Sequence, residues 1–403
     1  MAGQRLALPR TVWVLGFVSL FMDLSSEIYH ALLPVFITSV LALPVVALGA
    51  VDGIAEATAS FAKLASGRLS DRSRRRKPWV LLGYGMAALS KPLFPLSTGI
   101  IALMAARFID RIGKGIRGSP RDAMIADETP PRMLGRAFGL RQALDTAGAL
   151  LAPVLAMVLM FALADDIRAV FWIAVIPAML SFLIALFVLR EREPVRTPAK
   201  TQPLFRGFRD LEKDTRRLLA VGFLFMLARF SESFLILRGI ELGLSPALSP
   251  LAVVLFNLAF LALAYPAGAL SDRMDPRSIL MVGMAVLIAG DVILARGSGL
   301  AALAIGVLLW GAHMALTQGI FARMIADSAP EHLRATSFGA FYFVTGIAGL
   351  LASIGAGLIW DREGAGATFL TGAGAAAVAW AMLSLLPEER SSPSGGGGSR
   401  ASG

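Results

Sequence analysis

The chain contains no cysteine among its 403 residues and only three histidines. The absence of cysteine excludes disulfide bonds and thiolate chemistry, and it gives no indication of a redox compartment. Charged residues are scarce as well, at 16% of the chain against about 25% in soluble proteins. Hydrophobic residues make up 56% of the chain, and the mean hydropathy is +0.69. The long apolar runs behind these values indicate a protein that crosses a membrane several times.

Apolar runs of about 20 residues or slightly more recur along the chain, each long enough to cross a hydrocarbon core of about 30 Å. They predict an all-α membrane protein with twelve transmembrane helices, at 12–37, 45–67, 78–98, 100–120, 136–161, 168–189, 218–240, 250–270, 278–296, 300–322, 336–359 and 366–386. The first run is too long for the apolar region of a signal peptide, and no cleavage site follows it. We therefore expect it to be a membrane span.

Lysine and arginine concentrate in alternate loops, and this bias predicts which loops lie in the cytoplasm. The basic loops follow the second span (Arg72, Arg74, Arg75, Arg76, Lys77), the fourth span (Arg117, Arg121, Arg132, Arg136) and the sixth span (nine residues within 190–217). Loops 38–44 and 97–99 have no basic residue. Both termini are therefore predicted to be cytoplasmic. The net charge of +10 is interpreted as a topology signal and not as a nucleic-acid site.

The two halves of the chain repeat at an offset of about 200 residues. Residues 67–72 read Gly-Arg-Leu-Ser-Asp-Arg, and residues 268–273 read Gly-Ala-Leu-Ser-Asp-Arg. Met-Ile-Ala-Asp at 124–127 returns at 324–327. A parallel repeat of this kind predicts two six-helix bundles with a site between them. The expected organisation is an N-terminal bundle at 1–189, a cytoplasmic linker at 190–217, a C-terminal bundle at 218–390 and a disordered Gly/Ser tail at 391–403 that resembles an expression linker.

Three motifs give the chain a resemblance to the major facilitator superfamily. Residues 67–77 resemble its signature G-x-L-a-D-R-x-G-R-R-K, with Arg74 in place of the usual glycine. Residues 111–115 resemble R-x-x-q-G of its fourth helix, with Lys114 at the glutamine position. Residues 148–153 resemble G-x-x-x-G-P of its antiporters, with Ala152 for the second glycine. The resemblance covers nearly the whole chain. It implies the major facilitator fold, in which helices one, four, seven and ten line a central cavity.

The resemblance also implies a gate built from the repeated motif. A carboxylate at a helix end is stabilised by the positive N-terminus of a neighbouring helix. Asp71 is accordingly expected to contact the start of the eleventh helix when the cytoplasmic side is closed, and Asp272 the start of the fifth. The gating residues expected are Gly67, Asp71, Arg72, Gly268, Asp272, Arg273, Gly148 and Pro153. The alternative is that the basic cluster 72–77 serves only to set the topology.

Ionisable residues stand in the middle of several spans, where Asp, Lys or Arg costs about 2.5–3.5 kcal/mol. Such residues indicate a water-filled cavity or buried ion pairs. The residues predicted to bind substrate or protons are Asp23, Glu27, Glu56, Arg107, Asp110, Arg111, Lys114, Arg229, Glu232 and His313. The sixth and twelfth spans carry no charge in mid-span.

These charges have two competing interpretations. Carboxylates can exchange protons as a cavity changes access while the basic stripe holds an anionic or zwitterionic substrate, or the groups can form permanent salt bridges between helices. Asp23, Glu27 and His30 share one helical face by their spacing, so a divalent-cation site is a further alternative. Three further residues, Lys63, Lys91 and Asp291, are expected to snorkel or to pair locally. The small residues Gly49 and Gly53 predict close helix packing.

No enzyme is indicated, because Gly113-Lys114-Gly115 lacks the spacing and context of a phosphate loop and no catalytic triad or H-E-x-x-H motif occurs. We expect no cofactor and no metal site. The prediction is a monomeric, proton-coupled secondary transporter that exports a small organic compound by alternating access across a bacterial inner membrane. Its expected partners are a small-molecule substrate, protons and the lipid bilayer. The alternatives are a proton-linked symporter or facilitator of a polar, anionic or metal-chelate solute, and a non-transporting sensor or scaffold.

Overall fold

The computed structural model describes residues 8–72, 75–130, 133–191, 213–271, 274–328 and 334–385, and all regular secondary structure in these ranges is helical. The first half contains α1 (Arg10–Val35), a π-helical turn (Phe36–Val40), α2 (Val45–Arg72), α3 (Lys77–Ser90), α4 (Leu93–Leu96), α5 (Ile100–Glu128), α6 (Leu134–Ala162) and α7 (Ile167–Phe187). The second half contains α8 (Lys213–Ala228), α9 (Ser233–Glu241), a 3-10 turn (Pro246–Leu248), α10 (Leu251–Ser271), α11 (Pro276–Arg296), α12 (Gly299–Ser328) and α13 (Arg334–Leu385).

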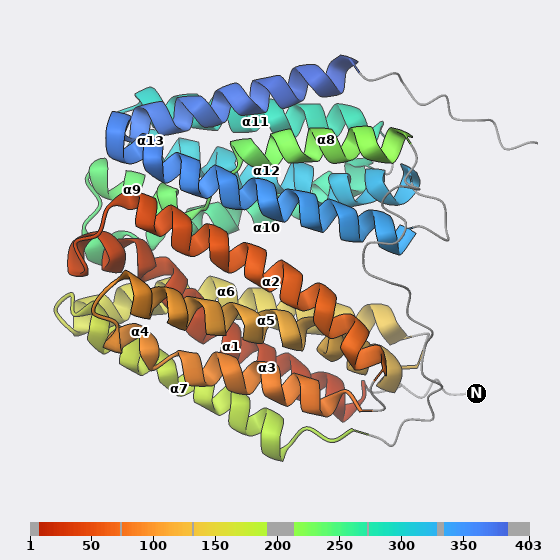
Figure 1. Cartoon of the computed structure of the whole chain (residues 1–403). Coiled ribbons are helices and arrows are strands. Elements are labelled where there is room, and N and C mark those ends of the chain that lie inside the picture. Colours follow the sequence, from red (N-terminus) through yellow and green to blue (C-terminus); the bar gives the residue numbers. More distant parts are fainter. Residues whose placement is uncertain are drawn as a thin grey trace, which may run out of the picture.

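Helices from the two halves of the sequence occupy opposite sides of the molecule. Figure 1 shows α1–α7, in red to yellow-green, below α8–α13, in green to blue. The long helix α2 packs against α5 on its own side and against α13 on the other side. In Figure 1, α2 and the first part of α13 lie close together at the left and separate toward the right, where the chain begins. The backbones of α2 and α13 therefore approach most closely at the end where α2 begins, and further along the two helices meet through side chains such as Phe61 and Phe343.

The membrane-spanning character of the helices is evident from their length and composition. In the described ranges, nine helical stretches are long and apolar enough to cross a membrane. All twelve predicted spans fall on helices, but α3 has only 14 residues, α5 is rich in charge, and one apolar stretch, Phe343–Leu385, covers two predicted spans. The chain is an all-helical, multi-pass membrane protein.

Two predicted spans are wrong in their continuity. The helix predicted at 78–98 ends at Ser90, and α4 starts at Leu93. Pro92 lacks a backbone N–H and so removes a hydrogen bond of the helix, although Lys91 and Pro92 both keep helical dihedral angles. The helix predicted at 218–240 is also broken, between Ala228 and Ser233. The predicted gap between the last two spans is found within α13, where Gly364 has a left-handed φ of 81°.

Arg117 and Arg121 were assigned to a loop by the basic pattern, and that assignment is wrong. Helix α5 continues to Glu128, so both residues are helical, and both are buried. The predicted end of this span was too early because the polar residues after Gly115 resemble a loop in composition. Their burial instead indicates that this part of α5 faces the interior of the protein.

Small residues hold α2 against α13, as their spacing predicted. A Cβ atom on Gly53 would lie 3.1 Å from the Leu350 Cα, and one on Gly357 would lie 2.6 Å from the Val46 Cα. A Cβ on Gly49 would collide with the carbonyl oxygen of Ser353. Close backbone contact of this kind requires glycine. The two halves are therefore sealed at the end of the molecule where α2 begins.

Candidate functional site

A cavity of about 1050 Å³ lies between the two halves of the chain. Its lining comes from α1, α2, α5 and α6 on one side and from α10, α12 and α13 on the other. Five carboxylates line it: Asp23, Glu27, Glu56, Asp122 and Asp145. Five cationic residues also line it: Lys63, Lys114, Arg117, Arg121 and Arg141. The formal charges of the lining side chains therefore balance.

All ten of these charged residues belong to α1, α2, α5 and α6. Among the side chains that the structure describes, the facing wall carries no charge and consists of Asn257, Phe260, Leu261, Gln318, Phe343 and Gly346. One wall thus supplies the electrostatic contacts of the cavity, and the other supplies amide, aromatic and aliphatic surface. A cavity lined by charged side chains is one of the two arrangements that the intramembrane charges predicted, the other being buried ion pairs.

The cavity is displaced toward one end of the molecule. It is bounded by the C-terminal halves of α2 and α5 and by the N-terminal half of α6, and so lies nearer to the ends of α2 and α5 than to their beginnings. At the opposite end, the Asp361 carboxylate accepts hydrogen bonds from the backbone N–H groups of Val45 and Val46, both at 2.8 Å. Asp361 thereby stabilises the positive N-terminus of α2 and adds to the glycine contacts between α2 and α13.

Some of the lining charges are paired within the cavity wall. Arg121 Nε lies 3.0 Å from Asp122 Oδ1, and Arg141 contacts both Asp122 and Asp145. Arg117 stacks over the Tyr84 ring, with 4.7 Å between its guanidinium carbon and the ring centroid. These contacts fix the geometry of the wall near the loops.

Other lining charges have no such partner. In the described part of the chain, five lining residues form no salt bridge within 4.0 Å and no side-chain hydrogen bond: Asp23, Glu27, Glu56, Lys63 and Lys114. Asp23 and Glu27 lie one helical turn apart on α1, and the opposite side chains of α2 and α5 reach the same hollow. Carboxylates without a protein partner are free to bind a proton or a solute. These five groups are therefore the chemically available part of the site.

Gly148 brings α6 close to α1 beside Asp23. A Cβ atom at residue 148 would lie 2.8 Å from the Leu20 carbonyl oxygen and 3.3 Å from the Asp23 Cβ. Pro153, the other residue of the antiporter-like motif, lies buried within α6. The motif thus shapes the helix pair that carries Asp23.

Arg107 and its partners lie at the sealed end, outside the main cavity lining. Arg107 Nη2 donates to Asp52 Oδ1 and to His30 Nδ1, both at 3.2 Å. The other oxygen of Asp52 accepts from the hydroxyls of Ser231 and Ser233. Asp52 therefore connects α2 and α5 of the first half to the broken helix α8–α9 of the second half.

Asp110 forms a buried ion pair and does not line the main cavity. Its Oδ1 lies 2.8 Å from Lys91 Nζ, and its Oδ2 lies 3.6 Å from Arg111 Nε. The Lys91 side chain is fully buried, and its ammonium group also donates to Ser26 Oγ at 2.9 Å. The expectation of local pairing for Lys91 is confirmed, whereas snorkelling is wrong because the ammonium group points inward.

The predicted residues of the second half lie around the helix break. Arg229 and Glu232 are half-buried in the non-helical segment between α8 and α9, and they interact electrostatically. The free backbone N–H of Ser231 donates to Ser353 Oγ at 3.2 Å, which satisfies one group that the break exposes. His313 is fully buried, and its ring packs edge-on against Trp310 and Phe225.

The predicted latch lies largely outside the described residues. Gly67, Asp71 and Arg72 fall in the last two turns of α2, but their side chains are outside the description, as is Gly268 in α10. Asp272 and Arg273 are outside the described residues altogether. The latch therefore remains a prediction.

Several lining residues were not among the predicted site residues. Lys63, Arg117, Arg121, Asp122, Arg141 and Asp145 contribute to the cavity. Helical spacing could have identified two of them, because Arg117 and Arg121 follow Lys114 at i+3 and i+7 and so continue its face. In the ranges that the structure describes, no group of three or more His, Asp or Glu side chains is arranged to hold a metal ion.

Comparisons with known proteins agree with this architecture. An uncharacterized MFS-type transporter of Methanocaldococcus jannaschii is 32% identical over 386 residues, which cover 94% of this chain and 95% of that protein. The multidrug resistance protein MdtL of Escherichia coli is 26% identical over 142 residues, covering 35% of this chain and 36% of MdtL.

Solved transporter structures share the same fold at low sequence identity. The nucleoside transporter NupG superposes with a TM-score of 0.80 and 14% identity, covering 93% of this chain and 99% of NupG. The human organic anion transporter MFSD10 superposes with a TM-score of 0.64 and 20% identity, covering 93% of this chain and all of that chain. The sequence pattern of the Major Facilitator Superfamily matches residues 15–352 and 218–402. With the pattern, the relative from M. jannaschii and the helical architecture in agreement, the chain belongs to the Major Facilitator Superfamily of transporters.

Proposed function

We propose that this transporter exports a small organic compound in exchange for protons by alternating access across a bacterial inner membrane. The observation that carries the proposal is the cavity of about 1050 Å³, which is hollow toward one end and sealed at the other by α2 and α13. An enclosed site with access from one side is what one end state of such a cycle requires. The hollow end faces the loops with most basic residues, so we assign it to the cytoplasm.

The topology belongs to the same proposal. Twelve spans in two six-helix bundles, at 1–189 and 218–390, joined by a linker at 190–217, would place both termini in the cytoplasm. The support is that each predicted span falls on a helix and that the two sequence halves lie on opposite sides of the cavity. We expect the monomer to be the working unit, because the cavity is formed within one chain.

Proton coupling is proposed for the carboxylates without a partner. Asp23 and Glu27 lie on the cavity wall with Glu56 across from them, and none of the three is held in an ion pair. A carboxylate that alternates between an aqueous opening and a closed interior changes its proton affinity with the state of the protein. Lys63 and Lys114 are unpaired cations of the same site, and they suit a substrate that carries an anionic group.

Export is favoured over uptake by two sequence relationships. The motif at 148–153 resembles that of antiporters, and the partial relative MdtL is a multidrug resistance protein. The neutral wall with Phe260 and Phe343 suits an organic body, and the charged wall suits its polar group. The proposed substrate class is therefore an amphipathic organic ion or zwitterion.

A flux assay distinguishes the direction of coupling. A panel of organic cations, anions and zwitterions is first screened by thermal shift, and stabilising compounds are then added outside proton-loaded proteoliposomes. An antiporter alkalinises the lumen, whereas a symporter acidifies it. Substrate flux without a pH change would indicate a facilitator, and thermal stabilisation without any flux would indicate a sensor.

Replacing a carboxylate side chain with the corresponding amide tests the role of individual residues in the same assay. Asp23→Asn and Glu27→Gln are expected to retain substrate exchange and to lose proton movement. Asp165→Asn is the control, because Asp165 is exposed in the turn between α6 and α7 and its left-handed φ of 64° suits asparagine. Unchanged proton coupling in both cavity variants would remove them from the mechanism.

A further inference from the structure

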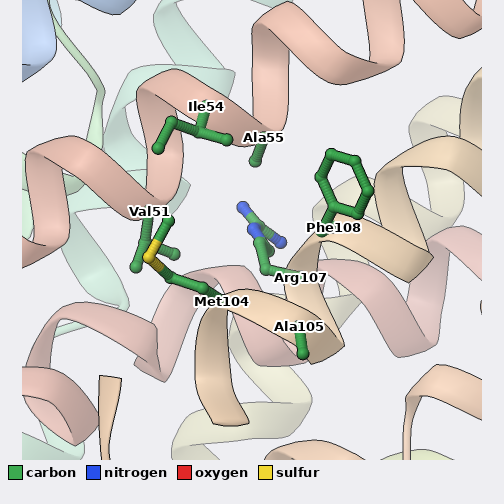
Figure 2. A pocket seen from close by; sticks show the side chains of 7 residues that line it. All are labelled: Val51, Ile54, Ala55, Met104, Ala105, Arg107 and Phe108. Carbon is green, nitrogen blue, oxygen red and sulfur yellow. The ribbon is translucent and has the colours of Figure 1, made fainter. Parts of the chain in front are cut away.

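A second, smaller pocket of about 200 Å³ lies between α2 and α5, apart from the main cavity. Figure 2 shows its lining, which consists of Val51, Ile54 and Ala55 from α2 and Met104, Ala105, Arg107 and Phe108 from α5. Arg107 is the one polar side chain among these lining residues. In Figure 2 its guanidinium group extends into the space between Ile54, Ala55 and Phe108.

The mouth of this pocket lies on the lipid-facing surface of the protein. Ile101, Ala105 and Phe108 share one face of α5 by their spacing, and Ile101 and Phe108 are 83% and 47% exposed. Arg107 is seven residues from the start of α5, which places it about 10 Å along the helix from the sealed end. A molecule that enters here therefore comes sideways from the bilayer.

The Arg107 guanidinium has hydrogen-bonding capacity that the protein does not use. Its Nη2 atom is occupied by Asp52 and His30, but Nε and Nη1 have no partner, although the residue is only 3% exposed. Buried donors without an acceptor are costly, and more so when they belong to a charged group. Asp52 is not available for them, since its second oxygen is taken by Ser231 and Ser233.

A water molecule is a poor hydrogen-bond acceptor for these donors in this pocket. An ordered buried water needs two to four polar partners, and apart from Arg107 the lining side chains are all apolar. An anionic oxygen at the end of an apolar chain would accept hydrogen bonds from Arg107, and the chain would contact the apolar lining residues. The Arg107 guanidinium is itself cationic and Lys114, further along α5, has no ion-pair partner, so the positive charge favours an anion over a neutral acceptor.

We propose that the α2–α5 pocket binds the carboxylate of an amphipathic carboxylic acid that enters from the bilayer, with Arg107 as the anion-binding residue and the Ile101–Phe108 face as the surface for the acyl chain. The pocket volume fits a carboxylate with its first methylene groups and leaves the rest of the chain in the lipid. Nε and Nη1 are themselves buried, so the ligand reaches them only when a side chain at the mouth moves. Met104 is the flexible one, with three rotatable bonds.

The test uses hexadecanoic acid that carries a photoreactive diazirine near its carboxyl end, with the purified full chain in nanodiscs. The labelled peptides are mapped by mass spectrometry. Labelling is expected on residues 51–55 and 101–108, with competition by hexadecanoic acid and none by hexadecanol. Equal labelling by a diazirine-bearing hexadecanol, or equal competition by phosphatidylglycerol, would overturn the carboxylate assignment.

A pair of variants separates the pocket from general lipid contact. Ala105→Trp fills the mouth and is expected to abolish the labelling, whereas Ala102→Trp, on an exposed residue outside the lining, is expected to retain it. Arg107→Lys keeps the charge but presents fewer donors, and it is expected to reduce labelling without abolishing it. The two tryptophan variants are also compared in thermal stability. If Ala105→Trp is as stable as Ala102→Trp and still shows full labelling, the proposed binding site is wrong. Photolabelling does not require proton-coupled flux, so the proposed binding site and the proposed transport function are tested independently of each other.

Discussion

The Asp361 carboxylate accepts hydrogen bonds from the backbone N–H groups of Val45 and Val46 at 2.8 Å, so that α13 of the second half caps the N-terminus of α2 in the first half. This contact joins the two halves of the chain at the sealed end of the cavity. The arrangement has the same physical basis as the latch predicted for Asp71 at the other end of α2. A carboxylate in each case would stabilise the positive end of a neighbouring helix.

Replacing Asp361 is expected to shift the transporter toward the state that is open at this end. Asp361→Ala removes a capping carboxylate worth about 1 kcal/mol, which corresponds to about a fivefold change in the equilibrium. Because the chain has no cysteine, spin labels at Val40→Cys and Leu248→Cys report the distance across this end without background. Glu363→Gln, a nearby exposed carboxylate, is the control. An identical distance distribution in Asp361→Ala and the control would show that the cap does not bias closure.

A larger side chain at Gly357 is expected to prevent tight closure of α2 on α13. The new Cβ would lie 2.6 Å from the Val46 Cα and 2.9 Å from the Val45 carbonyl oxygen, and backbone atoms cannot move aside cheaply. Gly357→Val should therefore widen the same label distance and lower the transport rate. Gly355→Val is the matched control, since a Cβ there has nothing within 4 Å. Equal behaviour of the two valine variants would contradict the packing argument.

Breaking the Lys91–Asp110 pair is expected to destabilise the fold. Asp110→Asn leaves the buried Lys91 ammonium without its charged partner, and loss of one partner of a buried pair costs about 3–5 kcal/mol. Unfolding in detergent would measure the loss. Glu241→Gln, which disrupts the more exposed pair with Arg238, is expected to cost at most about 1 kcal/mol.

The double variant Lys91→Met with Asp110→Leu provides the complementary measurement. Replacing both charges with apolar residues of similar size is expected to recover most of the lost stability. A stability as low as that of Asp110→Asn would indicate that hydrogen bonding to Ser26, and not charge pairing, dominates the site.

Neutralising the predicted latch is expected to slow turnover more than it weakens binding. Asp71→Asn removes the carboxylate that should stabilise the start of the eleventh helix in the cytoplasm-closed state, so fewer molecules would complete the cycle per unit time. Exchange rates and substrate-induced thermal shifts measured on the same preparation separate the two effects. The exposed Asp165→Asn again serves as the control. A change in binding alone would count against the latch.

The sequence predicted those features that depend on regular spacing along one helix. Long apolar runs located the helices, and Gly364 lies in the predicted gap between the last two spans. The glycines at 49 and 53 predicted close packing of their helix, and the structure identifies the partner as α13. Asp23 and Glu27 were placed on one face of their helix, and both line the cavity. Local periodicity is enough for these inferences because the relevant partners are the membrane and the neighbouring helix backbone.

Features that depend on contacts between distant residues were not predictable in the same way. The break at Arg229–Glu232 contains neither proline nor glycine, and its free groups are satisfied by Ser353 and Asp52 from other helices. Asp110 was predicted to bind substrate or protons, but its pairing with Lys91 depends on how far two side chains reach across an interface. Spacing along one helix carries no information about which charges on other helices will meet.

The separation of charge between the two cavity walls has a consequence for how a solute is selected. The charged lining residues that the structure describes all belong to α1, α2, α5 and α6, so they keep their mutual distances if the halves rock as rigid bodies. A solute can then exchange its hydration shell for the ionic wall before the neutral wall closes over it. Solutes would thus be selected by charge first and by shape second. Replacing a residue such as Phe260 with a larger or smaller one would change the selection by shape and leave the selection by charge unchanged.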